Sequence, residues 1–370
     1  MRGKLGTGRL ILSFMLAFAL VFSISGLAVA EETPNKLVIG KSLKMQEGAE
    51  LVDDFAFSFV ARGIAINDVE TSDLPALNMS ALTFQESMAG TLTGGVRTIE
   101  MATGDILDGV VWPHAGVFTY RITEVNKSAE YNTDTEEFLF DAVEYELNVY
   151  VKNDGDNLVV NVVTAAIVDP ETDEPGAKIT DTIDPIEGTL TIPFTNQYKQ
   201  IKGGGDDDLT GDELRFGKTV TGDYGNREKK FDFDVVVTLG ALSTEATGSI
   251  LIFDADDVLI SSTPLAGNLT SVVSLADGEY AVFSRLEIGT TVSVIERDYS
   301  SENYTASVNG TDGNEWTELV TKATGNAAFV NDHEIVDPTG IIIGALPFAA
   351  IIAAVIGVVV MVSRKRDEIA

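Results

Sequence analysis

The strongest constraint on the fold is a long series of short segments in which apolar and polar residues alternate. They fill the chain from Asn35 to Tyr198 and, in a second series, from about Leu214 to Asn331. A period of two is typical of β-strands buried on one face, and no long stretch between the two ends of the chain has helical periodicity. Asn153-Asp154-Gly155-Asp156 has the composition of a hairpin turn. The sequence therefore predicts an all-β protein.

The start of the chain has the pattern of a secretory signal peptide. Basic residues precede an apolar core from Leu10 to Phe22, and Ala28-Val29-Ala30 then supplies the small residues of a cleavage site. We therefore expect residues 1–30 to be removed and the mature chain to begin near Glu31, outside the cytoplasm.

Residues 336–370 combine a membrane-spanning pattern with a short motif that precedes it. Ile341–Val362 is an unbroken apolar run of 22 residues, about 33 Å long as a helix, and basic residues follow it. Because Pro338, Thr339 and Gly340 come directly before this run, the segment resembles Gram-positive sorting signals, in particular their V-P-T-G variants. The resemblance implies membrane insertion and then sortase cleavage between Thr339 and Gly340. An ordinary tail anchor is the alternative.

Composition narrows the class of function. The chain carries 25 Lys+Arg against 57 Asp+Glu, and this net charge of −32 would repel nucleic acid and suits a soluble surface protein. Cysteine is absent and the histidines are only His114 and His333, which excludes thiol enzymes and leaves no basis for a Cys/His metal site or a cofactor. Acidic clusters such as Asp206 to Asp208 lack the spacing of a calcium loop and are interpreted as solvated.

About 310 residues remain between the two signals, which is enough for two domains. We predict two tandem β-sandwiches, residues 34–200 and 211–335, joined by a flexible Gly/Asp linker at 201–210. The two halves match each other at four places: Gly40-Lys41-Ser42-Leu43 with Gly217-Lys218-Thr219-Val220, Phe55-Ala56-Phe57-Ser58-Phe59 with Phe231-Asp232-Phe233-Asp234-Val235, Tyr120-Arg121-Ile122-Thr123-Glu124 with Val292-Ser293-Val294-Ile295-Glu296, and Phe194-Thr195-Asn196 with Phe329-Val330-Asn331. Each half thus has one lysine in its first strand, one glutamate late, and one asparagine in its last strand.

These polar residues fall on the apolar side of their strands. Lys41 shares a strand face with Ile39 and Leu43. The same alternation places the other five among apolar neighbours: Glu124, Asn196, Lys218, Glu296 and Asn331. A strand end that reaches solvent would explain any single case, but it is a poor explanation for two matching sets.

Burial of these groups predicts a reaction. Desolvation lowers the pKa of a lysine and raises that of a glutamate, so both are driven towards their neutral forms. A neutral amine is a nucleophile, and a protonated glutamate can polarise an asparagine side-chain carbonyl and carry protons to the leaving ammonia. The expected product is a Lys–Asn isopeptide bond in the core, formed once and without an external enzyme.

Together, these motifs and the terminal sorting signal resemble the streptococcal pilin isopeptide linkage domain, in two copies between Asn35 and Gly340. That family consists of Ig-like sandwiches from Gram-positive pilins. The resemblance implies one bond in each copy, promoted by its glutamate: Lys41–Asn196 with Glu124, and Lys218–Asn331 with Glu296. The second copy departs from the family pattern in having Ile295 before its glutamate.

We therefore expect a pilin (fimbrial) subunit anchored in the cell wall, a structural polymer rather than a turnover enzyme. Its partners would be sortase and either other subunits or peptidoglycan. In the family, sortase joins the signal threonine to a lysine of the next subunit. Lys178, just before the last strand of the first copy, is the favoured acceptor, with Lys199 and Lys202 as alternatives. A monomeric wall-anchored adhesin is the main alternative function, whereas a surface hydrolase is disfavoured for want of a catalytic set.

Overall fold

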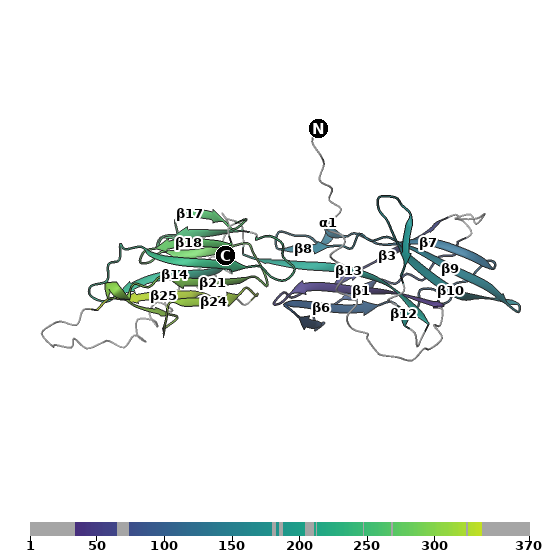
Figure 1. Cartoon of the computed structure of the whole chain (residues 1–370), viewed down its shortest axis with the longest axis horizontal. Helices are drawn as coiled ribbons and strands as arrows, with labels where there is room; N and C mark the ends of the chain where they lie inside the picture. The colour runs from purple at the N-terminus through teal and green to yellow at the C-terminus, as the bar shows by residue number, and fades with distance from the viewer. Residues whose placement is uncertain are drawn as a thin grey trace, which may run out of the picture.

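A computed structural model of the chain describes residues 34–64, 74–179, 183–184, 188–203, 211, 213–246, 248–267, 269–322 and 325–334. These residues are almost entirely β-structure, as the alternation predicts, and form two Ig-like β-sandwiches in tandem along an elongated molecule (Figure 1). The expected signal peptide and sorting signal lie outside the described residues. Within those residues, no helix combines the length and apolar character needed to cross a membrane.

The first sandwich places its two sheets face to face. Its elements are β1 (Lys36–Gln46), β2 (Phe55–Phe57), β3 (Phe59–Ile64), β4 (Leu82–Phe84), β5 (Thr91–Thr93), β6 (Val96–Ala102), β7 (Gly116–Glu124), α1 (Ser128–Tyr131), β8 (Glu136–Leu139), β9 (Tyr145–Asp154), β10 (Asn157–Val168), β11 (Pro175–Lys178), β12 (Ile183–Asp184) and β13 (Thr189–Lys202). One sheet has the order β12-β13-β1-β6-β5, with β8 also on β13, and the other has the order β11-β10-β9-β7-β3. The predicted hairpin joins β9 to β10, with Gly155 at a φ of 63° in its turn.

The second sandwich repeats this plan. Its elements are β14 (Leu214–Thr221), β15 (Phe231–Thr238), β16 (Ser249–Phe253), β17 (Leu259–Pro264), β18 (Thr270–Leu275), β19 (Tyr280–Ser284), β20 (Leu286–Glu287), β21 (Thr291–Glu296), a 3₁₀ turn (Ser300–Glu302), β22 (Thr305–Val308), β23 (Thr311–Asp312), β24 (Glu315–Leu319) and β25 (Ala327–Asp332). The sheets have the orders β17-β16-β19-β14-β25-β22-β23 and β18-β15-β21-β24.

In each sandwich the first and last long strands lie side by side and parallel. β1 pairs with β13 in the first sandwich, and β14 pairs with β25 in the second. Alternation sends every second side chain of these strands into the core: along β1, Leu37, Ile39 and Leu43 are fully buried, whereas Lys36 is exposed. Residues far apart in sequence are thereby brought together between the two sheets.

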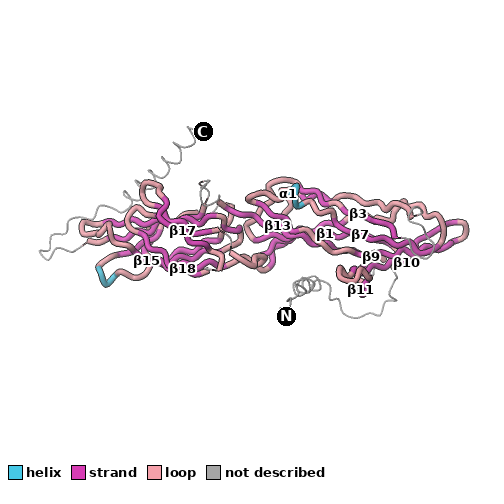
Figure 2. The backbone as a smooth tube through the Cα atoms, turned by 90° about the horizontal axis from the view of Figure 1, so that it is seen from above, coloured by secondary structure: helices cyan, strands magenta, loops and turns pink. Residues whose placement is uncertain are grey.

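The two sandwiches are joined by a continuing strand as well as by the chain that links them. β13 runs across the middle of the molecule in two views (Figure 1, Figure 2), and its last residues pair with β20 of the second sandwich. Ile201 and Lys202, which composition assigned to a flexible linker, are therefore strand residues. Gln46, at the end of β1, is 1% exposed. Its Nε2 donates to Ser243 Oγ at 2.9 Å and to Glu287 Oε1 at 3.3 Å, so that this side chain of the first sandwich is buried against the second.

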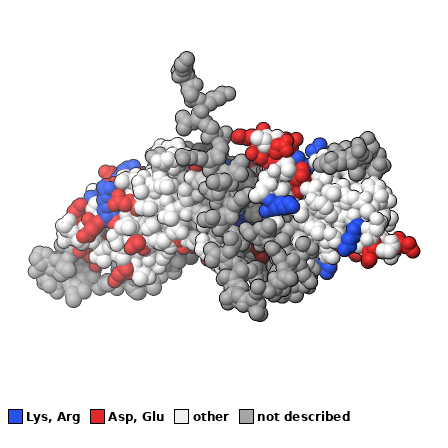
Figure 3. Space-filling view, turned by 45° about the vertical axis from the view of Figure 1, so that its right-hand side comes forward, with Lys and Arg blue, Asp and Glu red and all other residues white. Residues whose placement is uncertain are grey.

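Charged side chains occur in small groups spread over both sandwiches. On the face in Figure 3, acidic groups stand at several separate places with lysine and arginine between them, and most of the described surface is uncharged. The large negative net charge is therefore not concentrated in one patch on this face.

Candidate functional site

Three strands bring the first set of polar residues together. Lys41 lies in the middle of β1, Glu124 ends β7 in the opposite sheet, and Asn196 lies in β13 beside β1. All three are buried, with 1%, 7% and 0% of their surface exposed. In the parallel pair, Asn196 stands opposite Leu43, two residues beyond Lys41, and so both side chains point into the same core.

The carboxyl group of Glu124 bridges the other two side chains. Lys41 Nζ donates to Glu124 Oε2 at 2.7 Å, and Asn196 Nδ2 donates to Glu124 Oε1 at 3.0 Å. The lysine nitrogen also lies 5.0 Å from the centroid of the Phe57 ring. Amine, acid and amide are thus in contact in a site with apolar and aromatic walls.

Burial drives both ionisable groups towards neutrality. Desolvation lowers the pKa of Lys41 from 10.5 to about 8, although the charge of Glu124 opposes the shift. Desolvation also raises the pKa of Glu124, against the opposing effect of Lys41. The environment therefore favours a neutral amine beside a protonated acid more than bulk water does, in agreement with the sequence argument.

The second sandwich contains the same arrangement. Lys218 Nζ donates to Glu296 Oε1 at 2.8 Å, and Asn331 Nδ2 donates to the same oxygen at 2.6 Å. The three residues are 0–1% exposed, and Lys218 Nζ lies 4.5 Å from the Phe231 ring centroid. Desolvation lowers the pKa of Lys218 to about 8 and raises that of Glu296.

The strand registers of the two sets agree. Lys218 stands opposite Phe329, two residues before Asn331, as Lys41 stands opposite Phe194 in the first sandwich. Each glutamate stands opposite a phenylalanine of the neighbouring strand, Glu124 opposite Phe59 and Glu296 opposite Phe233. The two sets therefore occupy equivalent positions in the two sandwiches.

One of the four sequence matches is shifted by two residues. The sequence comparison equated Phe57 with Phe233. In the structure Phe59 is the counterpart of Phe233, and Phe57 is that of Phe231, because Phe57 and Phe231 are the rings nearest the two lysines. A two-residue slip leaves the alternation of faces unchanged, so the pattern alone could not detect it.

Sequence reasoning also missed a polar residue beside the first site. The backbone N–H of Asp141 donates to Asn196 Oδ1 at 2.8 Å. Asp141 follows β8 in a short irregular segment, where the alternation of apolar and polar residues does not predict which backbone or side-chain groups face the core. Its contact fixes the orientation of the amide: the oxygen faces Asp141, and the nitrogen faces Glu124.

The candidate acceptor Lys178 lies apart from both sites. It is exposed at the end of β11, an edge strand, opposite Ala166. Lys199 is 3.9 Å from Glu137 Oε2, and Lys202 Nζ donates to the carbonyl of Lys322 at the joint between the sandwiches. Thr339 and Gly340, the expected sortase cleavage site, lie outside the described residues.

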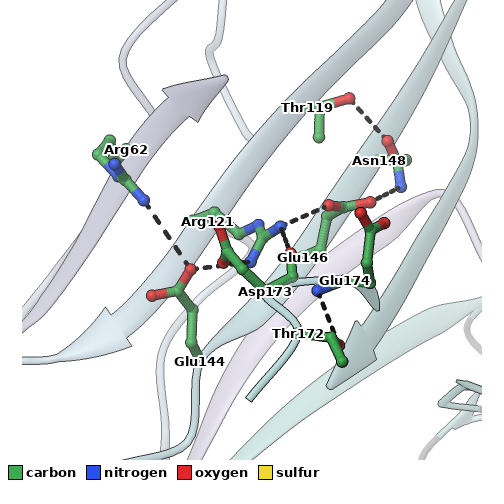
Figure 4. Close-up of polar contacts among 9 residues, drawn as sticks. All are labelled: Arg62, Thr119, Arg121, Glu144, Glu146, Asn148, Thr172, Asp173 and Glu174. Atoms are coloured by element: carbon green, nitrogen blue, oxygen red, sulfur yellow. Dashed lines mark hydrogen bonds and ion pairs between the residues drawn. The ribbon is translucent and has the colours of Figure 1, made fainter. Parts of the chain in front are cut away.

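A separate ionic cluster fastens the turn that leads into β11 (Figure 4). Arg121, whose side chain is 8% exposed, lies 3.1 Å from Glu144 Oε1, 3.2 Å from Glu146 Oε2 and 3.1 Å from Asp173 Oδ1. It also donates to the carbonyl of Asp173, a residue with a φ of 59°. One guanidinium thus binds several carboxylates beside β7 and β9. We interpret this cluster, called the Arg121 clamp below, as a structural contact that positions the turn before β11 rather than as a reactive site.

One family model matches part of the chain. Residues 212–333, which cover the second sandwich, match a family described as a domain of unknown function, DUF7601. No curated protein sequence matches the chain.

Two solved major pilins of Streptococcus pyogenes are similar to the chain in structure. One has 20% identity and a TM-score of 0.34, over 82% of this chain and 99% of the pilin. The T3.2 pilin has 15% identity and a TM-score of 0.33 over the same shares. A pilus-presented adhesin has 17% identity and a TM-score of 0.28, over 49% of this chain and 38% of the adhesin.

Proposed function

We propose that the chain is a structural subunit of the bacterial cell surface, of the pilin type, in which each sandwich crosslinks itself. The duplicated buried set of lysine, glutamate and asparagine is the observation that carries this proposal. Each set joins the first strand of a sandwich to its last strand, with the glutamate in contact with both partners. An ion pair kept for stability alone would not need an amide in contact with its carboxylate.

The proposed reaction forms one amide and releases one ammonia in each domain. The neutral amine of Lys41 attacks Cγ of Asn196, and a new C–N bond forms. The glutamate accepts the proton that the amine loses and delivers a proton to Nδ2, which leaves as ammonia. Lys218, Glu296 and Asn331 would react in the same way. Each site reacts once, so the protein does not turn over.

The ends of the chain support attachment to the cell wall. We infer that the apolar segment holds the chain in the membrane until sortase cuts between Thr339 and Gly340 and joins Thr339 to an amine. In a polymer that amine would belong to a lysine of the next subunit. Lys178 suits this role because it is exposed on an edge strand.

The mass of the intact mature chain tests the core chemistry. Each bond removes one ammonia, about 17 Da, so two bonds predict a deficit of about 34 Da from the sequence mass. Glu124→Ala should restore one ammonia and make the first sandwich sensitive to protease. The matched control Glu130→Ala replaces an exposed glutamate and should keep the full deficit. A wild-type chain at its full sequence mass would refute the proposal.

Cell-wall extracts distinguish the pilin from the monomeric adhesin. A pilin predicts a ladder of high-mass species that resists boiling in SDS, and Lys178→Arg should collapse the ladder if Lys178 is the acceptor. A single wall-linked band in the wild type would indicate the adhesin. Loss of all wall-linked protein on Thr339→Ala is expected in either case.

A further inference from the structure

Within the part of the chain that the structure describes, the amide oxygen of Asn196 in the first sandwich has a hydrogen-bond donor, whereas that of Asn331 in the second has none. The backbone N–H of Asp141 points at Asn196 Oδ1 from 2.8 Å, on the side of the amide away from Glu124. When an amine attacks an amide carbon, negative charge develops on that oxygen. A fixed N–H at this distance is the geometry of an oxyanion hole.

The sequence of the segment after β8 explains why this N–H is available. β8 remains paired with β13 only as far as Leu139 opposite Gln197, one position short of Asn196. The chain then turns, and both carboxylate oxygens of Asp141 accept backbone hydrogen bonds, Oδ1 from Val143 N at 3.0 Å and Oδ2 from Thr195 N at 2.8 Å. The side chain thus holds its own backbone N–H against the reacting amide.

The second sandwich keeps a regular strand at the equivalent place. β22 stays paired with β25 along the whole segment, from Thr305 opposite Asp332 to Val308 opposite Phe329, and so passes Asn331 without a break. At this place β22 is held in the sheet by its pairing with β25. Among the described residues, Asn331 Oδ1 and Glu296 Oε2 are both buried without a hydrogen-bond partner.

We propose that the backbone N–H of Asp141 is an oxyanion donor for the bond between Lys41 and Asn196, and that the Asp141 carboxylate is the positioning group for it. This inference rests on the proposed self-crosslinking. It predicts that the two bonds of one chain form at different rates. The bond of the first sandwich should form faster, because both the Asp141 N–H and Glu124 assist it. The bond of the second should form more slowly, because Glu296 is the group that assists it.

The Asp141 N–H and Glu124 have different roles in the proposed reaction. Lys41 Nζ attacks Asn196 Cγ, the carbonyl π electrons move to Oδ1, and the Asp141 N–H stabilises the resulting charge. Glu124 takes the proton from the attacking nitrogen and gives one to Nδ2, so that the carbonyl re-forms as ammonia leaves. In the second sandwich the carboxyl of Glu296 must serve both the oxygen and the nitrogen of Asn331, which is the slower arrangement.

Two conservative variants separate the position of the N–H from the charge of the side chain. Asp141→Asn removes the charge and keeps one of the two acceptor oxygens at the same reach, so that one of the two backbone hydrogen bonds remains. Asp141→Glu keeps the charge but lengthens the side chain, which displaces the backbone it fastens. Asp156→Ala, in the exposed turn between β9 and β10, controls for loss of one negative charge in the same sandwich.

The full mature chain is made by cell-free translation with a short pulse of labelled amino acid. Aliquots are quenched in acid and digested, and the crosslinked peptides of each sandwich are counted by mass. In the wild type we expect the first bond to form about 10²-fold faster than the second, the usual value of one oxyanion donor. Asp141→Glu should slow the first bond by about 10-fold or more, and Asp141→Asn should slow it by less, because one of the two hydrogen bonds that hold the turn is kept. The second bond should be unaffected in all variants, and the first bond should still reach completion, which together report that both sandwiches fold.

A first bond that forms as fast in Asp141→Glu as in the wild type would overturn the inference. So would an Asp141→Asn chain that reacts more slowly than Asp141→Glu, because charge rather than position would then control the rate. In both cases the bonds still form and the proposed function stands. A chain in which neither sandwich loses ammonia would remove the inference and the proposed function together.

Discussion

Removing the first crosslink without leaving a buried charge should lower stability by a calculable amount. The double variant Lys41→Met and Glu124→Gln replaces amine and acid with neutral groups of similar size, so the loss reports the bond itself. The bond to Asn196 closes a loop of 155 residues (196 − 41). The chain-entropy relation used for disulfides gives about 5 kcal/mol for a loop of this length. For a domain of this size, that is a fall in Tm of about 10–20 °C.

Differential scanning calorimetry of the mature chain measures this fall, and intact mass shows that one ammonia has been regained. Lys36→Met is the matched control, because Lys36 is an exposed neighbour on the same strand and its loss leaves both bonds in place. A Tm within about 3 °C of the wild type, with the mass regained, would show that the bond does not constrain the unfolded chain as this reasoning requires.

Three further results are expected. The rate of bond formation should rise as the pH rises towards about 8, because burial lowers the pKa of each lysine to about 8 and only the neutral amine is a nucleophile; a mass-based rate that does not change with pH below about 8 would contradict this. Gly289→Ala should loosen the joint and cost about 1–3 kcal/mol of unfolding free energy, since Gly289 has a φ of +90° and its Cβ would lie 2.6 Å from Gln46 Cβ. Gly267→Ala, with a φ of +75° and open space, is its control, and an equal loss in both by calorimetry would refute the packing argument. Arg121→Met should destabilise the first sandwich by about 2–4 kcal/mol because it leaves several carboxylates together without their cation, and an unchanged thermal transition would count against the Arg121 clamp.

Sequence reasoning predicted the parts of the molecule that depend on alternation. A strand with a strict period of two has only two faces, so the position of Lys41 between Ile39 and Leu43 was sufficient to predict its burial. The same simplicity explains the error in equating Phe57 with Phe233, because a shift of two residues leaves the faces unchanged.

Contacts made outside the strands could not be predicted in this way. Asp141 acts through a backbone group in an irregular turn, which no side-chain pattern reports. The glycine-rich linker suggested freedom between the domains. The contacts of Gln46 with the second sandwich are made to Ser243 and Glu287, which lie 197 and 241 positions away, and local composition carries no information about such contacts.

The continuous strand β13 has a mechanical consequence for a chain with both bonds in place. When the two ends of the chain are pulled apart, the force passes through the bond between Lys41 and Asn196 and does not load residues 42–195. In the same way the bond between Lys218 and Asn331 relieves residues 219–330 of the force. Between the two bonds only the segment 197–217 has no covalent bypass. Strand pairing holds most of its described residues: residues 197–200 pair with β8, residues 201–202 with β20, and residues 214–217 with β19. Fully extended, this segment spans about 70 Å. In single-molecule stretching the protein would therefore lengthen in this segment between the two bonds, while the bonded part of each sandwich kept its length.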